Sequence, residues 1–445
     1  MRSRHLSFMV FCLGMLPLAC SISRASDWTR FRGPNGSGVS EDSGPLPTTW
    51  SPTENLAWKV ALPGPGSSSP IVVGDRVFIT CWSGYGTSRD DRGEQSDLVR
   101  HLMCFDAKTG KVIWDSTVKA VLPEDDYRGM FAEHGYSSHS PVSDGDRVYV
   151  FFGKSGALAF DIDGKQLWQT SLGTDSDARG WGSASSPILY ENLVIVTASA
   201  ESNSMAALDK STGKVVWQQK APGFRATWGS PILVPVDDQR TDLVLGVPFE
   251  IWGVNPKTGG LKWFCEAMNT ESYCSSVVAE DGIVYGMEGM GGGSIAVKVG
   301  GEDDVTKTNV VWSGRHANRI GTPVIHDGLI YFVSGKIANC VDAKTGDEIY
   351  RSRLEAPEGN SADSGGDRGF RGGQDYSSPV VADGKLPYVA RNGDAYVLKL
   401  GREFEQLAVN RVPPDREDFS GTPAIDEGSL FIRSDKNLYR VSSAK

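Results

Sequence analysis

Aromatic and arginine side chains recur shortly before a repeated Ser/Thr-Pro step, and their types suit ligand binding. Aromatic rings stack on planar groups and attract cations, and the forked guanidinium of Arg holds carboxylates through paired hydrogen bonds. The pattern predicts a site for a planar or anionic ligand, or for an acidic peptide. The predicted members are Tyr136, Arg179, Trp181, Arg225, Trp228, Tyr273, Arg319, Arg371 and Tyr376. The alternative is structural: the rings cap the core between repeats, and the arginines pair with nearby Asp.

Catalytic and metal chemistry has weaker support in the sequence. His134 and His139 share one segment, but they have no third ligand at metal-binding spacing, so we expect solvated loop residues. Glu201, Glu250 and Glu288 each follow the second strand of a repeat, and no motif gives them a role. We therefore predict no catalytic residue and no metal ligand from motifs.

The cysteines do not form a recognisable framework. Five lie beyond the leader, scattered at Cys81, Cys104, Cys265, Cys274 and Cys340. An odd, unclustered set favours buried thiols over disulfides or a zinc site. The repeat pattern places Cys104 opposite Phe78 rather than Cys81, so a bridge between Cys81 and Cys104 is not expected.

A repeated unit must position these side chains. The stretch SSSPIVVGDRVFIT (67–80) returns in forms such as SHSPVSDGDRVYV and GTPVIHDGLIYF. The steps have Pro at 70, 141, 187, 231, 323, 379 and 423, and Val277 stands where an eighth Pro is expected. Apolar runs on both sides of a turn such as Asp-Gly predict a hairpin. Endings such as DAKTGKVIW add a second hairpin, so each unit is four short strands, A to D.

Most units are 44 to 46 residues long, and one four-stranded sheet cannot bury both of its faces. Such units stack radially, so we predict an all-β, eight-bladed β-propeller of four-stranded antiparallel blades. The last unit ends without strand D, and residues 54–60 have that strand's pattern, so this N-terminal strand is predicted to close the ring. A Trp at the end of strand D is predicted to dock each blade on the next. These residues are Trp58, Trp114, Trp168, Trp217, Trp263 and Trp312.

The N-terminus has the pattern of a secretory signal peptide, with a basic start, the apolar run LSFMVFCLGMLPLAC and a small-residue cleavage site before Ser26. We predict a signal peptide at 1–25, an N-terminal extension at 26–53 and the propeller at 54–445. The protein is expected to be periplasmic or secreted, and a lipid anchor at Cys20 is the less favoured alternative to soluble export. No other run is long enough for a transmembrane span. With 45 Lys+Arg against 55 Asp+Glu, a nucleic-acid partner is not expected.

The D-A-x-T-G-x-x-x-W ending resembles the pyrroloquinoline-quinone (PQQ) repeat, and DWTRFRGPNGSGVS (27–40) resembles the start of exported bacterial proteins built from such repeats. The resemblance implies membership of the quinoprotein alcohol dehydrogenase-like superfamily. It includes dehydrogenases that hold PQQ and Ca²⁺, and the propeller lipoprotein of the outer-membrane barrel-assembly machinery, a scaffold without a cofactor. Those dehydrogenases carry two adjacent cysteines over the quinone, and this chain has no Cys-Cys pair. No cofactor is firmly predicted, because no motif supports PQQ with calcium.

Three long insertions indicate which end of the ring binds. They lie at 82–100, 119–138 and 355–376, in B–C or D–A connections that emerge at the same end of a propeller. Loops on a rigid scaffold commonly carry binding sites. We therefore expect an exported, non-catalytic binding or scaffold protein that presents this loop-rich face to a protein, peptide or glycan partner. The alternative is a PQQ-dependent dehydrogenase with an atypical site.

Overall fold

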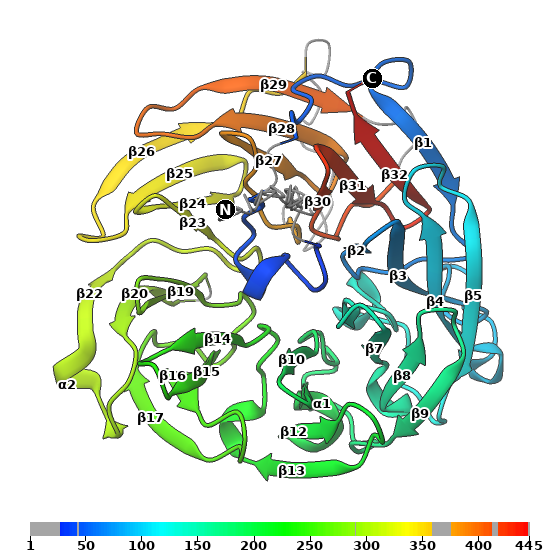
Figure 1. Ribbon diagram of the computed structural model, residues 1–445, viewed down its shortest axis with the longest axis horizontal. Helices are drawn as coiled ribbons and strands as arrows, with labels where there is room; N and C mark the ends of the chain where they lie inside the picture. Colours follow the sequence, from blue (N-terminus) through cyan, green and yellow to red (C-terminus); the bar gives the residue numbers. More distant parts are fainter. Residues whose placement is uncertain (1–26, 42–43, 290, 358–374, 412–416, 444–445) are drawn as a thin grey trace, which may run out of the picture.

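Runs rich in Val, Ile and aromatic residues, separated by tight turns, form sheets around a central axis in the computed structural model (Figure 1). The structure describes residues 27–41, 44–289, 291–357, 375–411 and 417–443. The predicted signal peptide, Cys20 and Arg371 lie outside these ranges. Eight sheets follow one another around the ring, which confirms the predicted eight-bladed propeller.

The strands of each blade run outward from the axis in the order A to D (Figure 1). Blades 1 to 4 comprise β2 (Ile71–Val73), β3 (Arg76–Ser83), β4 (Val99–Asp106) and β5 (Val112–Lys119); β6 (Val142–Ser143), β7 (Arg147–Phe151), β8 (Ala157–Asp161) and β9 (Gln166–Thr170); β10 (Ile188–Tyr190), β11 (Leu193–Ala198), β12 (Ser204–Asp209) and β13 (Val215–Lys220); and β14 (Ile232–Pro235), β15 (Thr241–Val247), β16 (Glu250–Val254) and β17 (Leu261–Glu266). Blades 5 to 8 comprise β18 (Val278–Glu280), β19 (Ile283–Glu288), β20 (Gly293–Lys298) and β22 (Val310–Gly314); β23 (Val324–His326), β24 (Leu329–Ser334), β25 (Ile337–Asp342) and β26 (Glu348–Arg353); β27 (Lys385–Val389), β28 (Asp394–Lys399) and β29 (Gln406–Arg411); and β30 (Ala424–Asp426), β31 (Ser429–Arg433) and β32 (Asn437–Ser442).

The ring closes as predicted, through a strand from the start of the chain. β1 (Leu56–Ala61) pairs antiparallel with β32 and takes the strand D position of blade 8. Blade 7 departs from the pattern, because the segment at its strand A position pairs with β27 through isolated contacts only. The Val380 N–H donates to the Pro387 carbonyl, and Ala382 forms an isolated β-bridge with Lys385. Closure leaves no blade without a neighbour, which protects the sheet edges.

Five of the six strand D tryptophans contact the next blade in one repeated way. The indole N–H of Trp58, for example, donates to the Ala107 carbonyl at 3.0 Å, and its ring covers Gly110 of the following turn. Gly110 has φ +72°, and a Cβ there would meet the ring at 2.7 Å, so the turn needs Gly for both reasons. The same indole bond is made from Trp114, Trp168, Trp217 and Trp312 to Ile162, Lys210, Pro256 and Ala343.

Trp263 does not make this contact. Blade 5 replaces the Thr-Gly turn with a longer connection containing β21 (Asp303–Asp304) and α2 (Thr306–Asn309), and β21 pairs parallel with β17. Trp263 instead lies against Gly253, and its indole N–H donates to Asp242 Oδ2 of its own blade at 2.7 Å. The ring is completely buried in the core shared by blades 4 and 5.

A closed belt of hydrogen bonds joins all eight blades around the channel. The belt is made by the Ser or Thr that precedes Pro in each Ser/Thr-Pro step, or precedes Val277 in blade 5. The backbone N–H of this residue donates to the hydroxyl oxygen of the equivalent residue in the next blade. All eight distances lie between 2.8 and 3.0 Å, and the last bond, from Thr422 to Ser69, closes the circle. We call this set the hydroxyl belt: Ser69, Ser140, Ser186, Ser230, Ser276, Thr322, Ser378 and Thr422.

Replacing one belt residue, by Ser230→Ala, is expected to lower the free energy of unfolding by about 1–3 kcal/mol, because the buried N–H of Ser186 loses its acceptor. Ser313→Ala, on the exposed strand β22, is the control and is expected to change it by less than about 0.5 kcal/mol. Urea denaturation of both variants measures the difference. Equal stability of the two variants would contradict a structural role for the belt.

Residues 27–40, predicted as part of an N-terminal extension, cross the centre of the ring (dark blue in Figure 1). The carbonyl oxygens of Trp28 and Thr29 accept the N–H groups of Val72 and Ser143, and the Ser40 N–H donates to the Val381 carbonyl. These contacts lie toward the A–B turns of blades 1, 2 and 7. The segment therefore closes the end of the channel opposite the loop-rich face.

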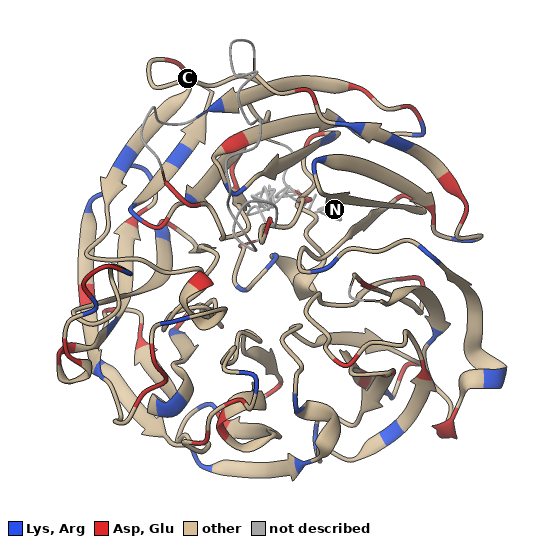
Figure 2. Cartoon of the chain, turned by 180° about the vertical axis from the view of Figure 1, so that it is seen from behind, with Lys and Arg blue, Asp and Glu red and all other residues tan. Residues whose placement is uncertain are grey.

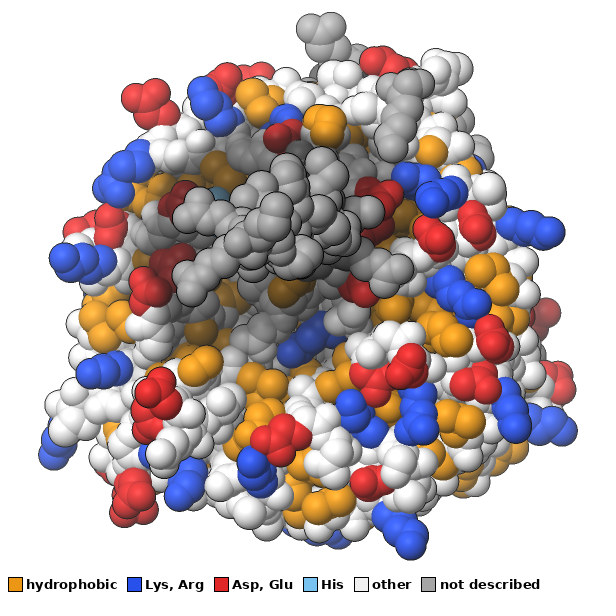
Figure 3. All heavy atoms as spheres, in the orientation of Figure 1, with side chains coloured by type: hydrophobic (Ala, Val, Ile, Leu, Met, Phe, Trp, Pro, Cys, Tyr) orange, Lys and Arg blue, Asp and Glu red, His pale blue; other side chains and the backbone are white. Residues whose placement is uncertain are grey.

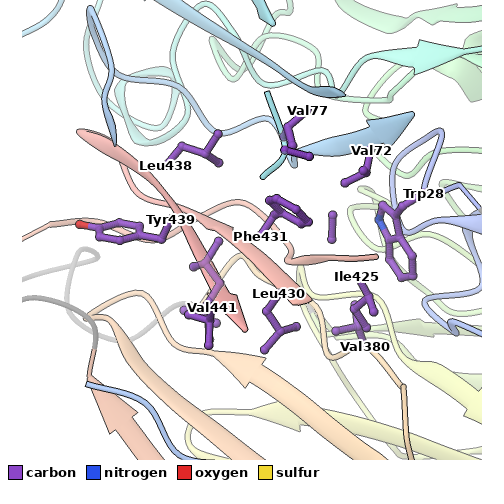
Figure 4. Close-up of a cluster of buried hydrophobic side chains, with 14 of the residues drawn as sticks. Trp28, Val72, Val77, Val380, Ile425, Leu430, Phe431, Leu438, Tyr439 and Val441 are labelled. Atoms are coloured by element: carbon purple, nitrogen blue, oxygen red, sulfur yellow. The ribbon is translucent and has the colours of Figure 1, made fainter. Parts of the chain in front are cut away.

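The hydrophobic core lies between adjacent blades, and the N-terminal segment contributes to it. Trp28, which is 0% exposed, joins a cluster from blades 7, 8 and 1 that includes Val72, Ile425 and Phe431 (Figure 4). Leu46 and Trp50 belong to the same cluster. The segment before β1 is thus packed as part of the propeller.

The surface mixes charges of both signs. Figure 2 shows Lys and Arg interspersed with Asp and Glu around the ring, and Figure 3 shows hydrophobic side chains inward of a charged rim on one face. No described helix is long and apolar enough to cross a membrane. The five cysteines named above are free thiols, and Cys104 lies opposite Phe78, as predicted.

Candidate functional site

A cavity of about 150 Å³ opens at the loop-rich end of the channel. The hydroxyl belt surrounds it, and Phe31 of the N-terminal segment forms its floor. Trp181, Trp228, Arg319 and Tyr376 line its mouth. The cavity is therefore a cup, closed below by residues 27–40 and open between the D–A loops.

Two tryptophans form an aromatic wall of the cup. The rings of Trp181 and Trp228 lie 5.1 Å apart at 38°. The Trp228 indole N–H donates to the Gly182 carbonyl at 2.7 Å, which fixes its ring, whereas Trp181 is only half-buried. Such a pair offers a flat apolar surface to a ring or a sugar face.

The loop after β5 extends over the mouth and is held from two sides. Glu133, in the 3₁₀ turn η3 (Phe131–Glu133), pairs with Arg89 and with Arg391 of blade 7, both at 2.7 Å. His134 Nε2 lies 2.6 Å from the Trp181 carbonyl, and burial lowers the pKa of His134, so the neutral ring donates there. Met130 and His134 of this loop consequently line the cup.

The prediction that His134 and His139 are solvated is wrong. His134 binds two partners in the wall of the cup, since its Nδ1 also lies 2.5 Å from Ser138 Oγ. His139 is 5% exposed, with Nε2 3.2 Å from Ser183 Oγ. The insertion folds back onto the blades and covers both rings, which histidine spacing alone does not indicate.

The structure brings together four of the nine predicted ligand residues: Trp181, Trp228, Arg319 and Tyr376. Tyr136 is 4% exposed and packs under the blade 1 loops, below the Arg100 guanidinium. Tyr273 is 1% exposed and fills the space over Gly246 and Gly286 between blades 4 and 5. Both aromatic rings therefore lie in packed cores rather than in the cup.

Two of the remaining predicted residues lie on the surface of the loop-rich face. Arg179 pairs with Glu271 at 3.2 Å and covers the Trp181 ring at 5.5 Å, while Arg225 is exposed. The Arg179 pair links the D–A loops of blades 3 and 5. The lining residues that the sequence prediction missed include the belt hydroxyls, Phe31, Met130 and His134. The repeated Ser/Thr of each step was the signal for the belt.

Three arginines are buried beside the belt. Arg30 Nη2 donates to the Pro231 carbonyl at 2.9 Å, and Arg32 donates to the carbonyls of Thr322, Pro323 and Pro379. Arg433 Nη1 donates to the Ser68 carbonyl at 3.3 Å. Burial lowers the pKa of Arg30 and Arg433 to about 10 and that of Arg32 to about 9, so all three stay charged near neutral pH.

Glu201, in the short helix α1 (Ser199–Ser202), forms a second buried polar group behind the wall of the cup. Ser183 Oγ donates to its Oε1 at 2.6 Å and also lies near His139. Burial raises the pKa of Glu201 from its usual 4.5 to about 7, with small contributions from Asp125 and Glu124. Burial lowers the pKa of His139 to about 3.

A raised carboxyl pKa means that the folded protein binds the proton more tightly, so this stabilisation is present at low pH and disappears as the pH rises through 7. Between pH 5 and pH 8 the free energy of unfolding of the native protein is expected to fall by about 2–3 kcal/mol relative to that of Glu201→Gln. The Gln side chain keeps an acceptor for the Ser183 hydroxyl. His139 titrates in both proteins, so the difference isolates Glu201. Urea denaturation at the two pH values measures it, and parallel pH profiles would contradict the prediction.

The residues around the cup do not fit a quinone held by calcium. Calcium requires several oxygen ligands, mostly carboxylates, and none of the described residues that line the cavity is an Asp or a Glu. Among the described residues, no group of three His, Cys, Asp or Glu is placed to hold a metal. Glu288 accepts the Cys274 N–H and Glu250 the Trp252 indole, so both serve other contacts. The volume is also below the roughly 300–1,000 Å³ of cofactor-sized pockets.

Sequence comparison finds two curated relatives. They are polyvinylalcohol dehydrogenases from Sphingopyxis sp. (strain 113P3), 22% identical over 314 residues, and from Pseudomonas sp, 23% identical over 274 residues. The alignments cover 58% and 50% of this chain but only 42% and 37% of the relatives. The chain therefore spans about two fifths of their length.

Solved structures share the fold. BamB from Moraxella catarrhalis has a TM-score of 0.59 at 11% identity, covering 87% of this chain and 97% of that chain. A europium-containing methanol dehydrogenase has a TM-score of 0.62 at 12% identity, covering 92% and 89%. The computationally designed Ika8 protein has a TM-score of 0.54 at 11% identity, covering 86% and 97%.

The family profile described as "Outer membrane protein assembly factor BamB" matches residues 99–349. That match takes in more than half of the chain, from the third strand of blade 1 to the outer strand of blade 6. The eight-bladed ring, its Thr-Gly turns and its docking tryptophans agree with the match. The chain therefore belongs to the PQQ-repeat propeller family of the outer membrane protein assembly factor BamB.

Proposed function

We propose that this protein is an exported, non-catalytic binding or scaffold propeller whose loop-rich face holds a protein, peptide or glycan partner. The observation that carries the proposal is the organised mouth: the loops there are tied across the ring by the Glu133–Arg391 and Arg179–Glu271 pairs. Ties of this kind hold the loops in one arrangement, which reduces the ordering entropy lost on binding. The predicted leader supports export, and the family description supports a role in assembly.

Capture from envelope extract by the immobilised full chain tests this proposal. Arg128→Glu with Arg225→Glu reverses two exposed charges on the loop-rich face, and it is expected to reduce capture of the partner at least about tenfold. Lys111→Glu with Lys214→Glu makes the same charge change at the opposite C–D turns and is the matched control. Equal capture by the two double variants, or a loss only with the control, would overturn the proposal.

The second candidate is a PQQ-dependent dehydrogenase, and the two curated relatives are both named as dehydrogenases. The part of the cup that the structure describes has no carboxylate in its lining, and its volume of about 150 Å³ is small for such a cofactor. We therefore expect that protein incubated with PQQ and Ca²⁺, then separated from free cofactor, shows no quinone absorbance and reduces no dye in the presence of alcohols. A quinone band that co-elutes with the protein in a one-to-one ratio would instead support the dehydrogenase.

A further inference from the structure

The described lining of the cup combines hydrogen-bond donors with a cation and includes no carboxylate. Each belt hydroxyl oxygen already accepts an N–H from a neighbouring blade, so its proton remains available for another acceptor. Among the described residues, no acceptor for these eight hydroxyl protons is found within the protein. Because the belt lines the cavity, an acceptor within the cup is within reach of several O–H groups.

The buried arginines add positive charge immediately outside the belt. Arg30 bonds the residue after Ser230, Arg32 bonds Thr322 and the residue after Ser378, and Arg433 bonds the residue before Ser69. No carboxylate of a described residue forms an ion pair with any of the three. Arg30 Nε and Arg433 Nη2 are buried without a hydrogen-bond partner. Uncompensated charge in a low-dielectric interior favours an anion nearby.

The shape of the cup limits what that anion is. Its volume of about 150 Å³ equals that of cavities that admit one benzene ring. Trp181 and Trp228 provide a flat wall, and Phe31 provides an apolar floor. Arg319 is the cationic residue among the described residues that line the same cavity. A ligand that uses all of these groups has one flat ring and one compact negative charge.

We propose that the cup binds a small monocarboxylate with a single flat ring, its carboxylate held by belt hydroxyls beside Arg319 and its ring against Trp181 and Trp228. This inference rests on the proposed function only in placing binding at the loop-rich end. It adds a ligand class, and it involves no covalent or redox step. Charge-assisted hydrogen bonds to a carboxylate are stronger than bonds to the corresponding neutral amide.

The experiment titrates the full chain with benzoate, benzamide and benzylamine, using isothermal calorimetry and tryptophan fluorescence. Benzoate is expected to bind at least about tenfold more tightly than benzamide, and benzylamine is expected not to bind. Arg319→Gln is expected to lower the affinity for benzoate at least about tenfold. Arg402→Gln, at an exposed position on the opposite end, is expected to leave it unchanged.

Equal affinity for benzoate and benzamide, or no benzoate binding, would overturn the inference. The ligand series on the unaltered protein decides this even if Arg319→Gln does not fold. Failure of the cup and failure of the proposed function are distinguishable. If benzoate does not bind but partner capture still depends on Arg128 and Arg225, the proposed ligand class is wrong and the proposed binding face stands.

Discussion

Trp28→Ala is expected to lower the free energy of unfolding by about 3–5 kcal/mol, as for other fully buried Trp side chains. The ring is 0% exposed and lies directly over Gly33, where a Cβ would meet it at 2.5 Å. It packs beside Val72 and Ile425, so its removal opens a cavity where the N-terminal segment joins blades 8 and 1 (Figure 4). Urea denaturation followed by circular dichroism measures the loss.

Trp181→Ala is the matched control for Trp28→Ala. Trp181 is half-buried at the mouth, and its main aromatic contact is Trp228, so its loss is expected to cost about 1 kcal/mol or less. If the two variants were equally stable, residues 27–40 would be an appendage rather than part of the core.

Trp58→Ala is expected to lower the free energy of unfolding by a similar 3–5 kcal/mol and to open the ring at its seam. Trp58 lies on β1, its ring centroid is 6.0 Å from that of Phe431, and its indole donates to Ala107 of blade 1. Loss of this side chain removes packing and a blade-to-blade hydrogen bond beside the seam where β1 pairs with β32. The neighbouring strand β32 is therefore expected to exchange its amide protons faster, at least about tenfold, which hydrogen-exchange mass spectrometry measures.

Trp58→Phe is the conservative comparison, since it keeps an aromatic ring and loses the indole N–H. It is expected to cost about 1–2 kcal/mol and to leave the exchange of β32 close to that of the native protein. Unchanged exchange of β32 in Trp58→Ala would contradict closure of the ring through β1.

The blade count and the closing strand were predictable because they depend on local periodicity. Alternating apolar residues around Asp-Gly turns repeat at nearly constant spacing, and residues 54–60 supply the missing strand pattern. Residues 27–40 carry no such period. No sequence pattern marks Arg30 and Arg32 as buried, and only the assembled ring provides the carbonyl oxygens of Pro231, Thr322 and Pro379 that bind them.

The candidate site was only partly predictable for a related reason. Trp181 lies six residues before Pro187 and Tyr273 lies four residues before Val277, yet Trp181 lines the cup and Tyr273 is buried over Gly246 and Gly286. The two rings differ in burial because the adjacent blades pack differently around them, and the sequence of a single repeat does not show this packing. The belt was visible as a repeated Ser/Thr, but its closure through eight N–H to hydroxyl bonds requires the ring.

The most direct test of the binding face is hydrogen–deuterium exchange of the protein alone and in complex with its captured partner. Protection is expected to be concentrated in the loops at 84–98, 120–138, 175–183 and 268–275, with the A–B and C–D turns unchanged. Protection concentrated at those turns, with the loop-rich face unaltered, would contradict the account.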